Sequence, residues 1–187
     1  ALAENKDATL NPKIYADENP VIQTEYRHVT KNSYSILDAS FNQGYKKTSN
    51  KKTGGSRHHI FARSDIELGF ETFDESKLTM NIQRVSNDTY LKVHDINSKI
   101  MTSNTVMNSS IEMNFSKNDT SMDINMDVYE DLSKTDDRYE FVVPNYDFKN
   151  KLFISDQLGI LNFQSRGYYK NYETNKKQTK LVNDFHW

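Results

Sequence analysis

The sequence contains no cysteine, which excludes a disulfide framework and any site that needs a thiolate as metal ligand or nucleophile. It has no run of about 18 apolar residues, so we expect no transmembrane helix. Neither sign of charge dominates, with 24 basic and 26 acidic residues, and the basic footprint of a nucleic-acid-binding protein is missing. Apolar residues make up 35% of the chain. This apolar fraction is low for a soluble protein with a thick hydrophobic core, but it is normal for a sheet in which half of each strand faces water.

What the sequence does contain is strict two-residue alternation of apolar and polar side chains. Residues 60–70 read IFARSDIELGF, and residues 122–128 read MDINMDV. Successive side chains of a β-strand point to opposite faces of the sheet. These segments are therefore predicted to form strands that have one apolar and one strongly polar face.

Strand-like runs of this kind recur along the whole chain, separated by Asn, Asp, Gly, Ser and Lys clusters. We predict an all-β fold: one antiparallel up-and-down meander of about ten strands over residues 1–187. The predicted strands are 8–15, 21–29, 34–45, 59–73, 78–85, 105–115, 122–129, 139–148, 152–172 (with a break near Asp156) and 179–187.

The connections between these strands favour a membrane location. From Lys31 to Arg138 short turns alternate with longer polar loops, such as 46–57, 86–104 and 130–138. An up-and-down meander through a membrane gives this pattern, with tight turns on one side and long loops on the other. We therefore expect part of a transmembrane β-barrel, although an antiparallel sheet with one wetted side has the same strand pattern.

The two faces supply the candidate functional residues. The polar face of two strands gives candidates for lining a barrel lumen: Arg63, Asp65, Glu67, Asp123, Asn125 and Asp127. The opposite face of the same segments gives candidates for lipid contact: Ile60, Ala62, Ile66, Leu68, Phe70, Met122, Ile124, Met126 and Val128. Several aromatic residues near strand ends, among them Tyr26, Tyr34, Phe73 and Tyr129, suit an interfacial girdle, but Tyr is also common in ordinary strands.

No catalytic or metal-binding set is visible in the sequence. The five histidines (His28, His58, His59, His94 and His186) lack the spacing of a metal site, and no serine lies in a nucleophile elbow. Gly54-Gly55 lacks the helix and lysine of a phosphate-binding loop. We therefore expect no enzyme, no catalytic residue, no metal and no cofactor.

Four short segments, in order along the chain, carry a family resemblance. Residues 3–15 read AENKDATLNPKIY, residues 25–27 read EYR, residues 85–91 read VSNDTYL, and residues 137–139 read DRY, with Pro144 and Tyr146 after them. Together they resemble the early barrel of LptD, the lipopolysaccharide-assembly protein family of the outer membrane. The first segment departs from the family pattern at Glu4 and Asn11.

The resemblance implies a location, an activity and partners. A family member lies in the outer membrane of a Gram-negative cell and passes lipopolysaccharide through a barrel with a lateral gate. Its partners are an LptE-type plug lipoprotein and an LptA-type periplasmic bridge protein. Pro12 stands where the family has a proline in a gate strand, and an ordinary edge-strand proline is an equal alternative. The N-terminal periplasmic jelly roll that binds the bridge protein, and further barrel strands, are expected to lie outside residues 1–187.

Two other function classes remain open on the sequence. A soluble secreted all-β binding module would bury its apolar face against a second sheet. A diffusion porin would share the barrel wall, although the early-barrel segments argue against it.

Overall fold

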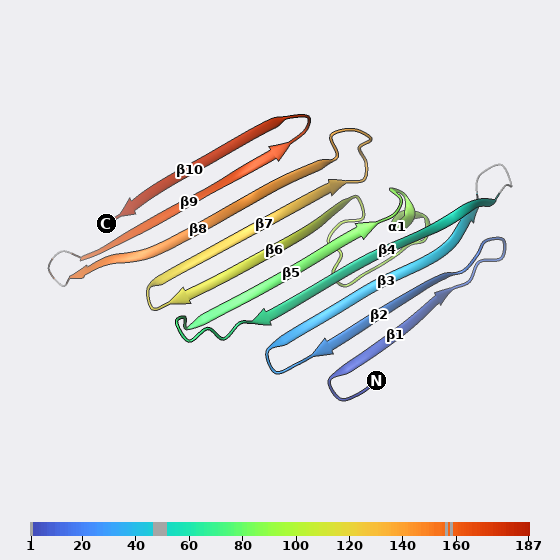
Figure 1. The fold of residues 1–187 in the computed structure, drawn as a ribbon, viewed down its shortest axis with the longest axis horizontal. Helices are drawn as coiled ribbons and strands as arrows, with labels where there is room; N and C mark the ends of the chain where they lie inside the picture. The colour runs from blue at the N-terminus through green and yellow to red at the C-terminus, as the bar shows by residue number, and fades with distance from the viewer. Residues whose placement is uncertain (1, 47–51, 156, 158) are drawn as a thin grey trace.

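In a computed structural model of the chain, β-strands make up most of the structure. The structure describes residues 2–46, 52–155, 157 and 159–187. The strands form a single sheet of ten antiparallel strands in sequence order (Figure 1). The strands are β1 (Lys6–Lys13), β2 (Val21–Val29), β3 (Ser33–Lys46), β4 (Lys52–Glu67), β5 (Glu75–Val85), β6 (Val106–Lys117), β7 (Thr120–Asp131), β8 (Tyr139–Ser155), β9 (Gly159–Tyr172) and β10 (Lys176–His186). The predicted all-β up-and-down meander is confirmed.

The sheet is open. β1 pairs with β2 alone and β10 with β9 alone, so each has a free edge among the described residues. The start of β1 and the end of β10 lie at the same edge of the sheet as the turn between β6 and β7 (Figure 1). We call the border formed by these strand ends the turn edge, which is distinct from the free edges that run along β1 and β10. The opposite edge carries the longest connection, residues 86–105, between β5 and β6.

Two predicted strand boundaries are wrong. β4 begins at Lys52 and ends at Glu67, whereas the sequence predicts residues 59–73. The strand ends early because Gly69 adopts a left-handed backbone (φ +64), which an L side chain rarely does. Leu68 and Phe70, predicted as lipid-facing strand residues, therefore lie in the connection to β5. This connection spans residues 68–74, where the strict short–long alternation predicts a short turn, so the alternation is also wrong there.

The predicted end of the strand 139–148 is also wrong, because β8 runs without a break from Tyr139 to Ser155 and β9 begins at Gly159. The break expected near Asp156 falls on a residue outside the described part of the chain. Pro144 lies in an irregular stretch of β8, where the register with β9 shifts between Val142 and Asn145. Proline has no N–H to donate to a ladder, and such irregularities are where strands accommodate it.

Residues 86–105, which we call the strap, fold back over one face of the sheet. The strap contains α1 (Tyr90–Val93), a single helical turn that contacts β4. No helix among the described residues is long and apolar enough to cross a membrane. The main apolar cluster lies under and around the strap and consists of Val21, Phe61, Val85, Tyr90, Leu91, Ile96, Met107 and Leu132.

Candidate functional site

All six predicted lumen-lining residues lie on one face of the sheet. Cross-strand pairing links Asp65 to Thr79, Thr79 to Glu112, and Glu112 to Asn125, and directly opposed residues share a face. Alternation then places Arg63 and Glu67 of β4, and Asp123 and Asp127 of β7, on the same face. We call this the polar face. It is the face that the strap covers, because His59 and Phe61 of β4 share it and lie buried under the strap.

The charges of the polar face are mostly paired with each other. Arg63 donates from Nε to Oδ2 of Asp65 at 3.1 Å, and Thr79 donates its hydroxyl to the other oxygen of Asp65 at 2.9 Å. Asn114 donates to Oδ1 of Asp123 at 2.8 Å. Arg63, a predicted lumen-lining residue, is therefore held by a neighbouring carboxylate and is poorly placed to serve as a free phosphate ligand.

The opposite face, which we call the apolar face, is left open. It carries the predicted lipid-facing residues that lie in strands: Ile60, Ala62, Ile66, Met122, Ile124, Met126 and Val128. Phe70, beyond the end of β4, still stacks on Phe115 of this face, with ring centroids 6.5 Å apart. Large side chains are half exposed here, including Ile60 (45%) and Ile82 (54%). A soluble one-sheet domain has the reverse arrangement, with its core on the apolar face.

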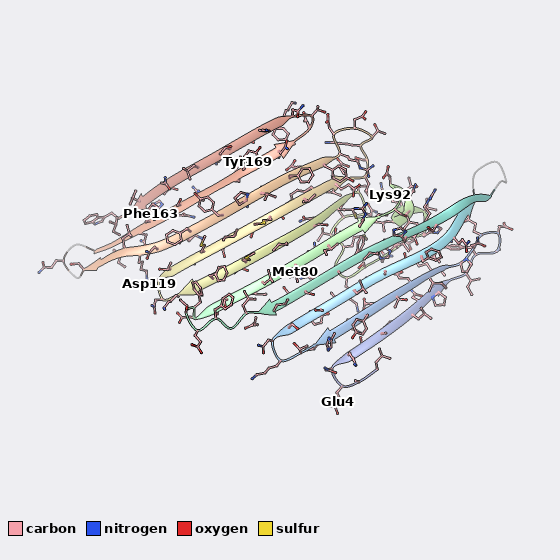
Figure 2. All side chains as sticks on the ribbon, viewed as in Figure 1. Glu4, Met80, Lys92, Asp119, Phe163 and Tyr169 are labelled. Carbon is pink, nitrogen blue, oxygen red and sulfur yellow. The ribbon has the colours of Figure 1, made fainter. Side chains whose placement is uncertain are left out.

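Aromatic rings gather toward both ends of the apolar face. At the turn edge Phe73 packs on Phe115 at 5.0 Å, and Phe163 packs on Phe185 at 5.0 Å. Tyr169, on the same face of β9, lies toward the opposite edge (Figure 2). Phe141, which is paired with Val128 of this face, stacks on Tyr139 toward the same end, with ring centroids 6.3 Å apart. Aromatic rings therefore border both ends of the apolar face.

The predicted girdle residues fit these borders incompletely. Phe73 is part of the turn-edge row, and Tyr26 lies on the apolar face opposite Leu37. Tyr34 and Tyr129 lie on the polar face, since they are paired with Asp65 and Asn108. Nearness to a strand end did not reveal which face these side chains occupy.

A buried polar network fastens the strap to the sheet. Nε2 of His59 lies 3.2 Å from Oδ1 of Asp38, and its Nδ1 lies 2.6 Å from Oγ of Ser40. The hydroxyl of Tyr90, at the start of α1, is 2.8 Å from the same Oγ. All four side chains are at most 4% exposed. Buried polar groups that find partners in this way define one arrangement, because separating them leaves unpaired donors and acceptors.

The serine, histidine and carboxylate of this network have the residue types of a nucleophilic triad, but the geometry does not serve one. Oγ of Ser40 is hydrogen-bonded by both His59 and Tyr90, and the strap seals it from solvent. A nucleophile has to reach a substrate carbon beside donors that hold the developing oxyanion. Because the Tyr90 hydroxyl contacts Oγ of Ser40, the network holds the strap on the sheet.

Further contacts join the strap to other strands. Gln83 of β5 donates to the carbonyl of Ile100 at 2.8 Å, and Gln23 of β2 donates to the carbonyl of Asn97 at 3.0 Å. Asp88 accepts from Nη2 of Arg138 at 2.8 Å, so the third and fourth segments that carry the family resemblance meet in space. The strap is thus fixed at several points along its length.

His94 ends the helical turn of the strap in an aromatic pocket. Its ring lies 5.0 Å from that of Tyr90 and 5.7 Å from that of Tyr15, measured between centroids. Burial lowers the pKa of His94 below its ordinary value, Lys13 lowers it further, and Glu18 opposes them. The neutral imidazole is therefore the form that fits the closed strap.

One groove lies at the margin of the strap, next to the first strand. It has a volume of about 460 Å³ and lies between β1, β2 and strap residues 97–99. The groove is lined by Thr9, Asn11, Lys13, Gln23, Glu25, Asp38, Asn97, Ser98 and Lys99. The sequence did not reveal it, because its two walls are about 80 residues apart in the chain.

Pro12 lies in β1, the edge strand, opposite Ile22. That position suits both meanings that the sequence allows, a gate-strand proline and an ordinary edge-strand proline. Elsewhere, the described part of the chain contains no group of three His, Asp or Glu side chains that could hold a metal ion.

The sequence contained part of the signal for the buried network. The alternation places Asp38 and Ser40 on one face. It also directs the neighbouring side chains of His58 and His59 to opposite faces, so one of the two histidines faces the same way as Asp38 and Ser40. What was missing is the register of β3 with β4, which brings Ser40 opposite His59.

Comparison of the chain with known protein families and with curated protein sequences finds no match.

Proposed function

We propose that this chain forms part of the wall of an outer-membrane β-barrel that assembles lipopolysaccharide into the outer leaflet. In this proposal the apolar face contacts lipid and the polar face lines the lumen. The barrel closes through further strands paired to the edges of β1 and β10. Lipopolysaccharide passes by binding and release, with no covalent step.

One observation carries the membrane part of this proposal: the apolar face is uncovered across the sheet, while the strap and the main apolar cluster lie on the polar face. Exposed apolar surface of this extent marks a contact with lipid or with another protein. The aromatic borders at both ends of the apolar face favour lipid, because membrane barrels carry aromatic girdles at the two interfaces. An open edge cannot stay in lipid, so the wall has to close.

The choice of lipopolysaccharide as the transported molecule rests on the family resemblance and on the polar face. A passage for a lipid that carries sugars needs neutral hydrogen-bonding groups and charges that are already paired. Such groups bind the sugars only weakly, so the sugars are released again. Asn114 with Asp123, and Thr79 with Asp65, are of this kind. A plug lipoprotein and a periplasmic bridge protein are the partners that the proposal implies.

The absence of cysteine from residues 1–187 allows a direct test of the two faces. Ser110→Cys and Ile111→Cys place a thiol at neighbouring positions of β6, on the polar and the apolar face. In outer membranes that contain the full-length protein, a membrane-impermeant maleimide should label position 110 and a lipid-soluble maleimide position 111. Equal labelling of both by the impermeant reagent would support a soluble binding module and overturn the proposal.

Transport is tested with a photoreactive amino acid at Asn125, on the polar face. We expect an adduct with newly made lipopolysaccharide that forms during a metabolic pulse and disappears during the chase. The same substitution at Ile124, on the apolar face, should give adducts with resident lipid that persist. Labelling of the two faces as expected, without any transient adduct, would leave the diffusion porin as the better function.

A further inference from the structure

The groove beside the strap has walls that are fixed before any ligand arrives. Gln23 bridges β2 and the strap, because its Nε2 donates both to the carbonyl of Asn97 and to Oδ1 of Asp38, at 3.0 and 3.1 Å. Nζ of Lys99 lies 2.9 Å from Oε1 of Glu25, and Nζ of Lys13 donates to the carbonyl of His94 at 2.9 Å. A site that is already formed saves the ordering cost that a ligand otherwise has to overcome.

The charges of the groove are balanced and already engaged. Its two amines, of Lys13 and Lys99, bind a strap carbonyl and a carboxylate. Its two carboxylates, of Glu25 and Asp38, accept hydrogen bonds from Lys99 and from Gln23. A phosphate would compete with Glu25 for Lys99 while facing two carboxylates, so the groove is a poor site for an anion.

Neutral hydrogen-bonding groups remain available in the groove. The hydroxyl of Thr9 and the side-chain amide of Asn11 line it from neighbouring same-face positions of β1 and have no partner among the described residues. The amide of Asn97 faces them from the strap and makes weak contacts, at 3.4 Å, with Asp95. Hydroxyl and amide groups both donate and accept, as sugar hydroxyls do.

We propose that this groove is a binding subsite for the uncharged part of a saccharide. It lies on β1, the edge strand that carries Pro12, so a sugar held there sits beside the first strand of the sheet. The inference deepens the proposed function and rests on it for the source of the sugar. No aromatic side chain of the described residues lines the groove, so binding is weak and reversible, which suits passage through a lumen.

The test uses the full-length protein in detergent and the lipid-free, dephosphorylated core oligosaccharide of lipopolysaccharide as the probe. Binding is measured by saturation-transfer NMR and titration. Asn11→Leu removes the amide while keeping a side chain of similar size, and we expect the dissociation constant to rise about fivefold, as for one lost hydrogen bond. Thr9→Val, which keeps the shape of the side chain, should weaken binding in the same direction.

The matched control is Gln178→Leu, which removes an amide from the polar face of β10, far from the groove across the sheet. It should bind the oligosaccharide as the unaltered protein does. Equal affinity of the Asn11→Leu, Thr9→Val and Gln178→Leu proteins would overturn the proposal. So would inorganic phosphate that displaces the oligosaccharide at millimolar concentration, since it would make the groove an anion site.

These outcomes are independent of the face-labelling experiment. Loss of the groove effect with labelling as expected would remove the subsite and leave the barrel wall in place. A groove effect in a protein whose apolar face is labelled by the impermeant reagent would instead give a soluble saccharide-binding module.

Discussion

The hydroxyl of Tyr90 lies 2.8 Å from Oγ of Ser40, a residue fifty positions earlier in the chain, and both side chains are buried. This bond joins the first turn of the strap to the network on β3 and β4. It explains why a long polar connection lies on the sheet, since releasing the strap would expose Tyr90 and Leu91 together with unpaired polar groups.

The Tyr90–Ser40 bond can be removed by Tyr90→Phe without changing the packed volume. We expect the strap to open more easily by about 1 kcal/mol, the net contribution of a hydrogen bond of this kind. Amide hydrogen exchange in residues 90–96 should then be about fivefold faster, because exchange there follows local opening. Tyr34→Phe is the control, as Tyr34 is exposed and its hydroxyl has no partner in the described chain. Unchanged exchange in Tyr90→Phe would contradict this account of the strap.

The faces of β6 allow a stability test in lipid. Ile111 lies near the middle of the strand on the apolar face, 40% exposed, and Ser110 lies on the polar face opposite Asp127. Ile111→Arg should destabilise the full-length protein in lipid vesicles by about 2–4 kcal/mol if it lies near the bilayer midplane. Ser110→Arg should cost far less. The measurement is reversible denaturation in vesicles, and equal costs for the two variants would mean that the faces are wrongly assigned.

Lowering the pH should loosen the strap through His94. Burial lowers the pKa of His94, so the closed strap binds fewer protons than the released strap does. The stability of the closed strap is therefore complete above the ordinary histidine value of about 6.5, and it falls as the pH drops from there toward the lowered pKa. The protection factors of the strap amides, which are corrected for the fall of the intrinsic exchange rate with pH, should therefore decrease between pH 7.5 and pH 5.

Two variants decide whether His94 is responsible. His94→Gln should abolish most of this loss of protection at low pH, because it leaves no proton to bind at this position. His186→Gln should leave the profile unchanged, since His186 is exposed at the end of β10. A profile that is the same in His94→Gln and in the unaltered protein would assign the pH dependence to another group.

Gly167 is a position where the sheet tolerates no side chain. A Cβ atom there would lie 2.7 Å from the carbonyl oxygen of Lys180 and 3.0 Å from Cε1 of Tyr146. Gly167→Ala should therefore destabilise the protein by about 1–3 kcal/mol through overpacking, with loss of exchange protection between β9 and β10. The control is Asn183→Ala on β10, which removes atoms from an exposed position and should change stability little.

Strand order and face assignment could be predicted from the sequence, because both follow from a period of two and from polar turns. Asp65 and Asn125, predicted as lumen-lining from separate strands, do lie in one cross-strand row. The end of β4 could not be predicted, because residues 68–70 continue the alternation while Gly69 turns the backbone away.

The strap and its groove were beyond sequence reasoning for a different reason. Tyr90, Leu91 and Ile96 are a short apolar signal within a polar connection, and their partners Val21 and Phe61 come from distant strands. Which residues they meet depends on the register of β2, β3 and β4, and hence on contacts that no local pattern records. The groove at Asn11 depends on the same packing of the strap against these strands, because residues 97–99 of the strap form one of its walls.

The strap also makes the sheet mechanically uneven. It is tied to β2, β3 and β5 by hydrogen bonds and rests on β4, whereas no hydrogen bond or ion pair joins it to β9 or β10 in the part of the chain that is described. A segment that is hydrogen-bonded to several strands resists bending of those strands, because bending would strain its hydrogen bonds. If the sheet forms the proposed barrel wall and has to change its curvature while a bulky molecule moves along it, we expect the bending to concentrate in β8–β10, whereas the strands next to Pro12 should move together as a rigid unit.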